Sequence, residues 1–169
     1  MPREQINIRV VLTYLVMSLF VHYFVAYDKL EEYVRHCIKE ERFIEAIVLI
    51  HTSIEIYLSG IIADTLDNNE KIKVVQNFKF IDLAKICYIL DVTDRTAYFK
   101  LRSLNKVRNS LAHQDFSSNL TVHELVKKVE EWLDLANYIL KIGIKVHDEW
   151  QEKHPELKAL FDQVMNNNS

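Results

Sequence analysis

Glycine and proline are almost absent from this chain, and their scarcity restricts its fold more than any other feature of the sequence. Only Gly60, Gly143, Pro2 and Pro155 occur among the 169 residues. Because these residue types end helices and form tight turns, their near absence favours a few long helices over many short strands. A chain of this length also suits one hydrophobic core. The sequence therefore predicts an all-α protein, folded as a single compact bundle of about four or five helices.

Apolar periodicity divides the chain into helical segments. Between charged or turn-forming stretches, apolar residues recur at intervals of three and four, as they do on the buried face of a helix. Tyr33 and Val122 are among the residues expected on such faces, and Thr93 and Asp94 are suited to cap the helix that follows them. The expected helices cover 28–39, 43–66, 80–90, 95–112 and 121–150.

The N-terminal segment is a long uncharged run, because only Thr13, Ser18 and His22 interrupt the apolar residues between 10 and 27. We expect 1–27 to form an apolar helix that is buried in the core or in a dimer interface. Its length is at the lower limit for crossing a bilayer, so a membrane segment is the weaker alternative, and its valine and aromatic content also allows a strand. The remaining chain divides into a helical domain, 28–160, and a disordered polar tail, 161–169.

Charge and cysteine content narrow the class of protein further. A formal net charge of −3 excludes a protein that coats nucleic acid through bulk positive charge, so any such contact must come from a local patch. Cys37 and Cys87 fit neither a disulfide framework nor a metal-ligand spacing, which suggests buried thiols in the cytoplasm. The sequence contains no glycine-rich phosphate loop and no acidic cluster at metal-ligand spacing, so we expect neither a cofactor nor a metal.

One segment departs from the acidic balance of the whole. Residues 95–114 contain five basic side chains and no acidic one. On a helical wheel, Leu101, Leu104, Val107 and Leu111 form the core stripe. A separate arc of roughly 60° holds a histidine, an amide and two cations. Such an arc suits an anionic phosphate, and the residues that form it are Arg102, Lys106, Asn109 and His113.

The segment 108–113, Arg-Asn-Ser-Leu-Ala-His, resembles the hallmark of the HEPN superfamily (higher eukaryotes and prokaryotes nucleotide-binding). That hallmark is an arginine, a polar residue that is often asparagine, a short spacer and a histidine, and Arg108, Asn109 and His113 match it. The long upstream helix with Glu45-Ala46 and Ile54-Glu55 is also similar to the second helix of the family. The resemblance covers about 27–145 and leaves the N-terminal run unexplained.

The resemblance implies a metal-independent endoribonuclease that acts as a two-fold dimer, with both motifs lining a shared cleft. His113 would move the proton of the RNA 2′-hydroxyl or of the leaving oxygen, Arg108 would stabilise charge on the phosphate, and Asn109 would orient both. Arg102, Lys106 and Lys100 would bind the RNA. The family also suggests a toxin or defence effector, with a cognate antitoxin or a nucleotidyltransferase-type partner.

The residues also allow simpler interpretations. Arg108 lies about 140° from His113 on an ideal helix, beside the core stripe, so the two meet only if the helix ends between them or a second chain contributes. Arg108 could instead be a structural arginine, and His113 could interact with the helix dipole. The alternative to a nuclease is therefore a non-catalytic HEPN module that binds nucleotide, RNA or a protein partner. Exposure of His113 in a cleft would distinguish the two.

Overall fold

The structure, a computed structural model, describes residues 27–67, 73–75, 77–112, 121–156 and 158–159. Within these ranges the protein is all-α, as the sequence predicts, and no strand is present. The helices in chain order are α2 (Tyr27–Lys39), α3 (Phe43–Leu66), α5 (Phe80–Ile89), α6 (Arg95–Ala112) and α7 (Val122–Lys153).

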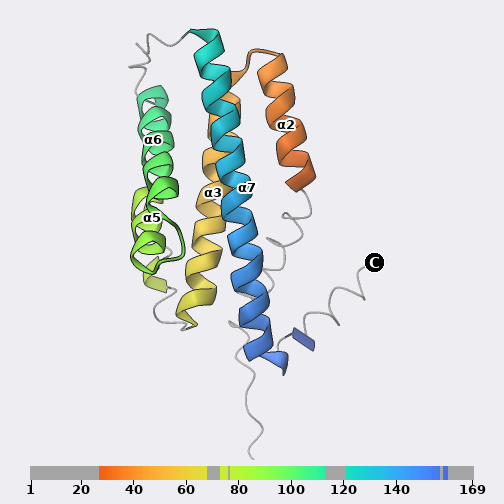
Figure 1. The fold of residues 1–169 in the computed structure, drawn as a ribbon, viewed down its shortest axis with the longest axis vertical. Helices are drawn as coiled ribbons and strands as arrows, with labels where there is room; N and C mark the ends of the chain where they lie inside the picture. The colour runs from red at the N-terminus through yellow and green to blue at the C-terminus, as the bar shows by residue number, and fades with distance from the viewer. Residues whose placement is uncertain (1–26, 68–72, 76, 113–120, 157, 160–169) are drawn as a thin grey trace, which may run out of the picture.

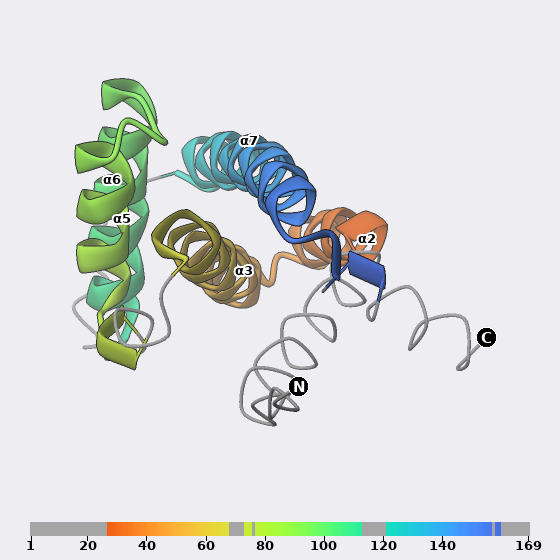
Figure 2. The ribbon, with the colours of Figure 1, turned by 90° about the horizontal axis from the view of Figure 1, so that it is seen from below.

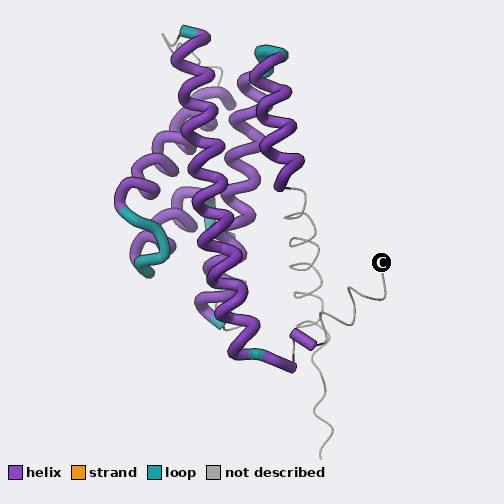
Figure 3. The backbone as a smooth tube through the Cα atoms, turned by 45° about the vertical axis from the view of Figure 1, so that its right-hand side comes forward, coloured by secondary structure: helices purple, strands orange, loops and turns teal. Residues whose placement is uncertain are grey.

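The two longest helices, α3 and α7, lie side by side along the long axis of the molecule (Figure 1). Seen from below, α2 flanks this central pair on one side, and α5 and α6 flank it on the other (Figure 2). α6 packs against α5, α3 and α7, so its inner face is covered and its outer face borders solvent. Loops in the described ranges are short and lie at the helix ends (Figure 3).

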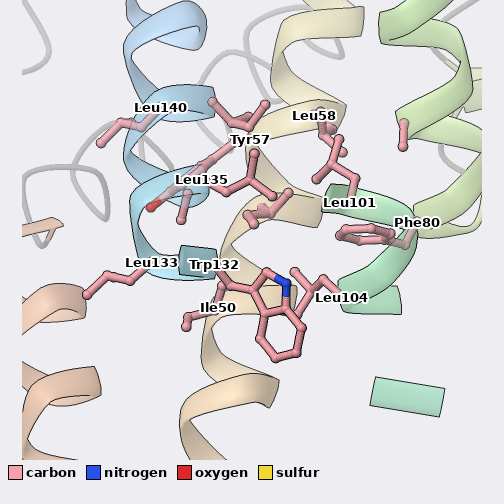
Figure 4. Close-up of a cluster of buried hydrophobic side chains, with 14 of the residues drawn as sticks. Ile50, Tyr57, Leu58, Phe80, Leu101, Leu104, Trp132, Leu133, Leu135 and Leu140 are labelled. Atoms are coloured by element: carbon pink, nitrogen blue, oxygen red, sulfur yellow. The ribbon is translucent and has the colours of Figure 1, made fainter. Parts of the chain in front are cut away.

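The core forms where α3 passes between its neighbours. α3 is apolar on most sides and buries Ile47, Ile50, Ile54 and Leu58 among others. Figure 4 shows Leu135 of α7 on one side of α3 and Phe80 and Leu101 of α5 and α6 on the other, with the ring of Trp132 from α7 beside Leu104 of α6. Each large apolar side chain that leaves water in this way contributes about 1.5–3 kcal/mol to stability, so this cluster holds α6 against the bundle.

Two residues that were expected on buried faces are exposed. Tyr33 of α2 is 61% exposed, and Val122 in the first turn of α7 is 58% exposed. Tyr33 is one position away from the buried stripe of Val34 and Cys37, and Val122 precedes the first α7 residue that contacts the core, Leu125. The sequence prediction was wrong for both, because periodicity cannot determine where a neighbouring helix stops covering a face.

Side-chain caps precede α6 and α7, and the one before α6 was predicted from the sequence. The Asp94 carboxylate accepts a hydrogen bond of 2.7 Å from the backbone N–H of Ala97, as expected for the residue before α6. At the start of α7, Thr121 and Glu124 form a reciprocal capping box, in which each side chain accepts a bond from the backbone N–H of the other.

The predicted N-terminal helix, 1–27, lies outside the described residues except for Tyr27, which begins α2. The predicted tail, 161–169, lies outside them too, as does residue 160, the last residue of the predicted helical domain. In the described part of the chain, α3 is the helix long and apolar enough to cross a membrane by length and composition, but half of that stretch is buried within the protein. The core helix of a bundle meets the same criteria.

Candidate functional site

The outer face of α6 presents the basic residues that the sequence singles out. Leu101 and Leu104 are fully buried against the bundle, and this fixes the rotation of the helix about its axis. Arg102, Lys106 and Asn109 therefore point away from the core and are exposed, as the helical wheel predicts. Arg95 and Lys100 are exposed as well. The predicted arc is thus a continuous surface of α6, up to the position of His113.

Several cations outside α6 form local ion pairs, and the described cations of α6 form none. Arg35, Arg42, Lys85 and Lys145 each form an ion pair with a carboxylate three or four residues away in their own segment. Among the described residues, no carboxylate forms an ion pair with any cation of α6, because 95–112 contains no acidic residue and no neighbouring helix supplies one. A row of cations of this kind can bind a polyanion without first breaking internal ion pairs.

Arg108 and Asn109, the first two residues of the predicted motif, contact each other. Nη1 of Arg108 donates a hydrogen bond of 3.3 Å to Oδ1 of Asn109, and both side chains are exposed. The head group of Arg108 therefore lies in solvent. Its guanidinium keeps donors available for a planar anion such as a phosphate.

A buried polar contact between α3 and α6 lies close to the Arg108–Asn109 end of α6. His51 of α3 is only 5% exposed, and its ring stacks on Phe80 with a centroid separation of 4.0 Å. Its Nε2 lies 3.3 Å from Oδ1 of Asn105 in α6, and its Nδ1 lies 3.9 Å from Oε2 of Glu55. Because Asn105 accepts at Nε2, the neutral ring carries its proton there.

The electrostatics of His51 link it to the motif. Burial lowers the pKa of His51, and the positive charge of Arg108 lowers it further. The bond to Asn105 and the charge of Glu55 act in the opposite direction but do not reverse the shift. The Arg108 guanidinium is therefore close enough to α3 for its charge to act on a buried group.

Of the predicted site residues, the structure places Arg102, Lys106 and Asn109 on one exposed face and brings Arg108 into contact with Asn109. Lys100 is exposed but lies about 120° around the helix from Lys106. His113 directly follows the last residue of α6 and lies outside the described residues. His51 and Asn105 were not predicted to support the site. The available signal was the i,i+4 pair of His51 and Glu55 within an otherwise apolar helix.

Within the described ranges, no group of three or more histidine, cysteine, aspartate or glutamate side chains is placed to hold a metal ion. Comparison with protein-family models, with curated proteins and with solved structures finds no match to this chain. The function is therefore argued from the chemistry of the site.

Proposed function

We propose that this protein is a HEPN-type endoribonuclease that cuts RNA without a metal ion, using Arg108, Asn109 and His113. Arg102, Lys106 and Lys100 bind the RNA in this proposal. The HEPN-like fold, a two-fold dimer, a cytoplasmic location and a role as a toxin or defence effector with an inhibitory partner belong to the same proposal. They rest on the resemblance of segment 108–113 to that family.

The observation that carries the proposal is the row of cations on α6, for which the described part of the chain supplies no carboxylate partner. Arg95, Arg102 and Lys106 are exposed on the face that leads towards the Arg108–Asn109 contact, and no acidic residue of α6 offsets them. In a protein with a net charge of −3, a local concentration of positive charge favours one specific anionic ligand over general attraction to polyanions. RNA supplies both the phosphates for these cations and a 2′-hydroxyl for His113.

The chemistry needs no group beyond these side chains. His113 accepts the proton of the 2′-hydroxyl as its oxygen attacks the adjacent phosphorus, and the His113 imidazolium returns that proton to the 5′-oxygen as the bond between phosphorus and that oxygen breaks. The products are a 2′,3′-cyclic phosphate and a 5′-hydroxyl. Arg108 stabilises the charge that builds on the phosphate oxygens, and Asn109 holds the Arg108 guanidinium through the bond that joins them.

A dimer accounts for the angle between the motif residues. α6 is helical through Ala112, so the Arg108 side chain leaves the helix on the side near α3, about 140° from the direction expected for position 113. In a two-fold dimer, Arg108 of one chain could approach His113 of the other. We propose that the complete site contains residues of both chains.

The test is to incubate the wild-type protein with labelled total RNA in EDTA beside His113→Ala and the control His36→Ala. His36 is an exposed histidine of α2, on the opposite flank of the bundle from α6. We expect the wild type and His36→Ala to cut RNA and His113→Ala not to, with fragments that end in a 2′,3′-cyclic phosphate. Loss of cutting in EDTA, or equal cutting by all three proteins, would refute the proposal.

One observation favours the alternative, a HEPN module that binds RNA, nucleotide or a protein partner without cutting. The charge of Arg108 acts on the buried His51, so this arginine also stands beside a contact between two helices. If the wild-type protein is dimeric and binds RNA but cuts none of several RNA classes, the binding module is the better description.

A further inference from the structure

A second feature of α6 is a cluster of aromatic side chains. Three aromatic side chains gather where the end of α5 meets the first turns of α6. The ring centroids of Tyr88 and Tyr98 are 5.0 Å apart with an interplanar angle of 12°, and those of Tyr98 and Phe99 are 5.8 Å apart. Phe99 is 48% exposed. A large apolar ring is therefore displayed on a polar helix face.

Guanidinium groups lie over these rings. The Arg95 Cζ is 5.6 Å from the centroid of Phe99, and the Arg102 Cζ is 5.9 Å from the centroids of both Tyr98 and Phe99. Each of these contacts has the spacing of a cation–π interaction. They hold both cations beside the exposed ring faces, so one small surface offers positive charge together with aromatic area.

These residues continue the basic row. Arg95, Phe99, Arg102, Lys106 and Asn109 are spaced by four, three, four and three positions, which places them on one side of a helix, and all five are exposed. At 1.5 Å per residue the row is about 21 Å long. It runs from the first residue of α6 to the Arg108–Asn109 contact. We refer to these five residues as the α6 row.

The combination of aromatic and basic side chains in the α6 row favours some polyanions over others as its ligand. A duplex presents phosphates but keeps the faces of its bases stacked inside, so an exposed phenylalanine would gain little from it. A single strand presents unstacked bases, which pack on aromatic rings, as well as phosphates, which pair with arginine and lysine. An acidic protein segment would match the charge but presents planar groups only where it contains aromatic side chains, whereas every nucleotide of a single strand carries a base.

We infer that the α6 row is a binding track for single-stranded RNA. A base stacks on Phe99, phosphates contact Arg95, Arg102 and Lys106, and the strand is led towards the Arg108–Asn109 end of the helix. This inference rests on the proposed function, because it names the substrate class and the path to the same site.

The test measures binding to the full-length protein of a fluorescent single-stranded oligouridylate with 2′-O-methyl groups, which cannot be cut by attack of its own 2′-oxygen. Phe99→Ala is compared with Tyr33→Ala, which removes an exposed ring from α2. Arg102→Ala is compared with Lys145→Ala, which removes an exposed cation from α7. A 2′-O-methyl duplex of the same length is the competing ligand, and circular dichroism checks that each variant is folded.

We expect Phe99→Ala to weaken binding of the single strand at least about five-fold, since one stacked base contributes roughly 1–3 kcal/mol. Arg102→Ala should weaken it and reduce its dependence on salt, while Tyr33→Ala and Lys145→Ala should bind as the wild type does. Equal affinity of Phe99→Ala and Tyr33→Ala, or tighter binding of the duplex than of the single strand, would overturn the inference.

The two proposals fail separately. If Phe99→Ala loses affinity while the wild type cuts no RNA, the binding track stands and the nuclease is refuted. If the wild type cuts RNA in a His113-dependent manner while Phe99→Ala binds normally, the nuclease stands and the track is refuted.

Discussion

The Nε2 atom of His51 lies 3.3 Å from the Oδ1 atom of Asn105, and this contact joins α3 to α6 across 54 positions of sequence. The His51 ring is almost fully buried and stacks on Phe80. A buried ring nitrogen needs a hydrogen-bond partner, and Asn105 supplies it three residues before Arg108. The contact therefore fixes the position of the part of α6 that presents the candidate site.

Replacement of Asn105 by alanine should destabilise the fold. The substitution removes the acceptor for a buried donor, which typically costs about 1–3 kcal/mol. The free energy of unfolding from urea titration measures the loss. Asn109→Ala is the matched control, because it removes an exposed asparagine from the same helix and should change stability by about 0.5 kcal/mol or less. If both variants lose the same stability, the contact with His51 has no special role.

Protonation of His51 should make the protein less stable in mild acid. Burial, the largest cause, lowers the pKa of His51 below its ordinary value of 6.5 in the folded state. The unfolded chain therefore binds the proton first, so stability is full above about pH 6.5 and falls as the pH drops from there towards the folded pKa. Urea titrations between about pH 5 and pH 7.5 should show this slope.

The pH dependence can be attributed with two variants. His51→Phe keeps a ring beside Phe80 but cannot titrate, so its stability should change less with pH over the same range. His36→Gln removes an exposed histidine and should keep the wild-type slope. A wild-type slope in His51→Phe would mean that another group is responsible.

The sequence predicted the helices well where local signals were strong. The helices predicted over 43–66 and 95–112 have the same bounds as α3 and α6, because apolar periodicity defines their faces and polar residues flank them. Asp94 was also predicted as a cap, and its carboxylate accepts the bond that the prediction requires. The capping residue and the apolar periodicity are both local features, so a single amino-acid sequence reveals them.

Contacts between distant segments could not be predicted in the same way. The His51–Asn105 contact, and that of Nδ1 of His147 with Oδ2 of Asp64 at 3.0 Å, join residues 54 and 83 positions apart. Neither residue pair leaves a local pattern. Likewise, the charge of the α6 row was visible in the sequence, whereas the gathering of its rings with Tyr88 depends on how α5 packs against α6.

Asp67 should stabilise the lower ends of α3 and α7. It follows α3 with a φ of 44°, a left-handed conformation that aspartate tolerates better than alanine. Its Oδ1 accepts a bond of 3.0 Å from Nε1 of Trp150, and its Oδ2 lies 2.9 Å from Nε2 of His154. Asp67→Ala should therefore lower stability by about 1–2 kcal/mol, whereas Asp67→Asn, which keeps an acceptor and tolerates this φ, should lower it less.

Asp67 should also respond to acid. Burial would raise its pKa, but the bonds from Trp150 and His154 outweigh this effect and lower the pKa below the ordinary 3.8. Its contribution is therefore present above about pH 3.8 and disappears as the pH falls through the folded value. Thermal denaturation of the wild type and Asp67→Asn over this range should converge at the acid end. Curves that remain parallel would contradict the assignment.

Replacement of Arg108 should slow RNA cleavage without lowering the stability of the fold. If its guanidinium stabilises the charge on the scissile phosphate, Arg108→Ala should cut RNA about 100-fold more slowly or worse, and Arg108→Lys should recover only part of the rate because it lacks the planar fork. Since the side chain is exposed, the free energy of unfolding should change by about 0.5 kcal/mol or less.

The same variant offers a second measurement, because the charge of Arg108 lowers the pKa of His51. In Arg108→Ala the pKa of His51, followed by NMR titration of its ring protons, should rise above its wild-type value. A rise in the pKa of His51 with unchanged RNA cleavage would mean that Arg108 lies where the structure puts it but takes no part in the chemistry. Loss of cleavage together with that rise would link the motif arginine to both the reaction and the buried histidine below it.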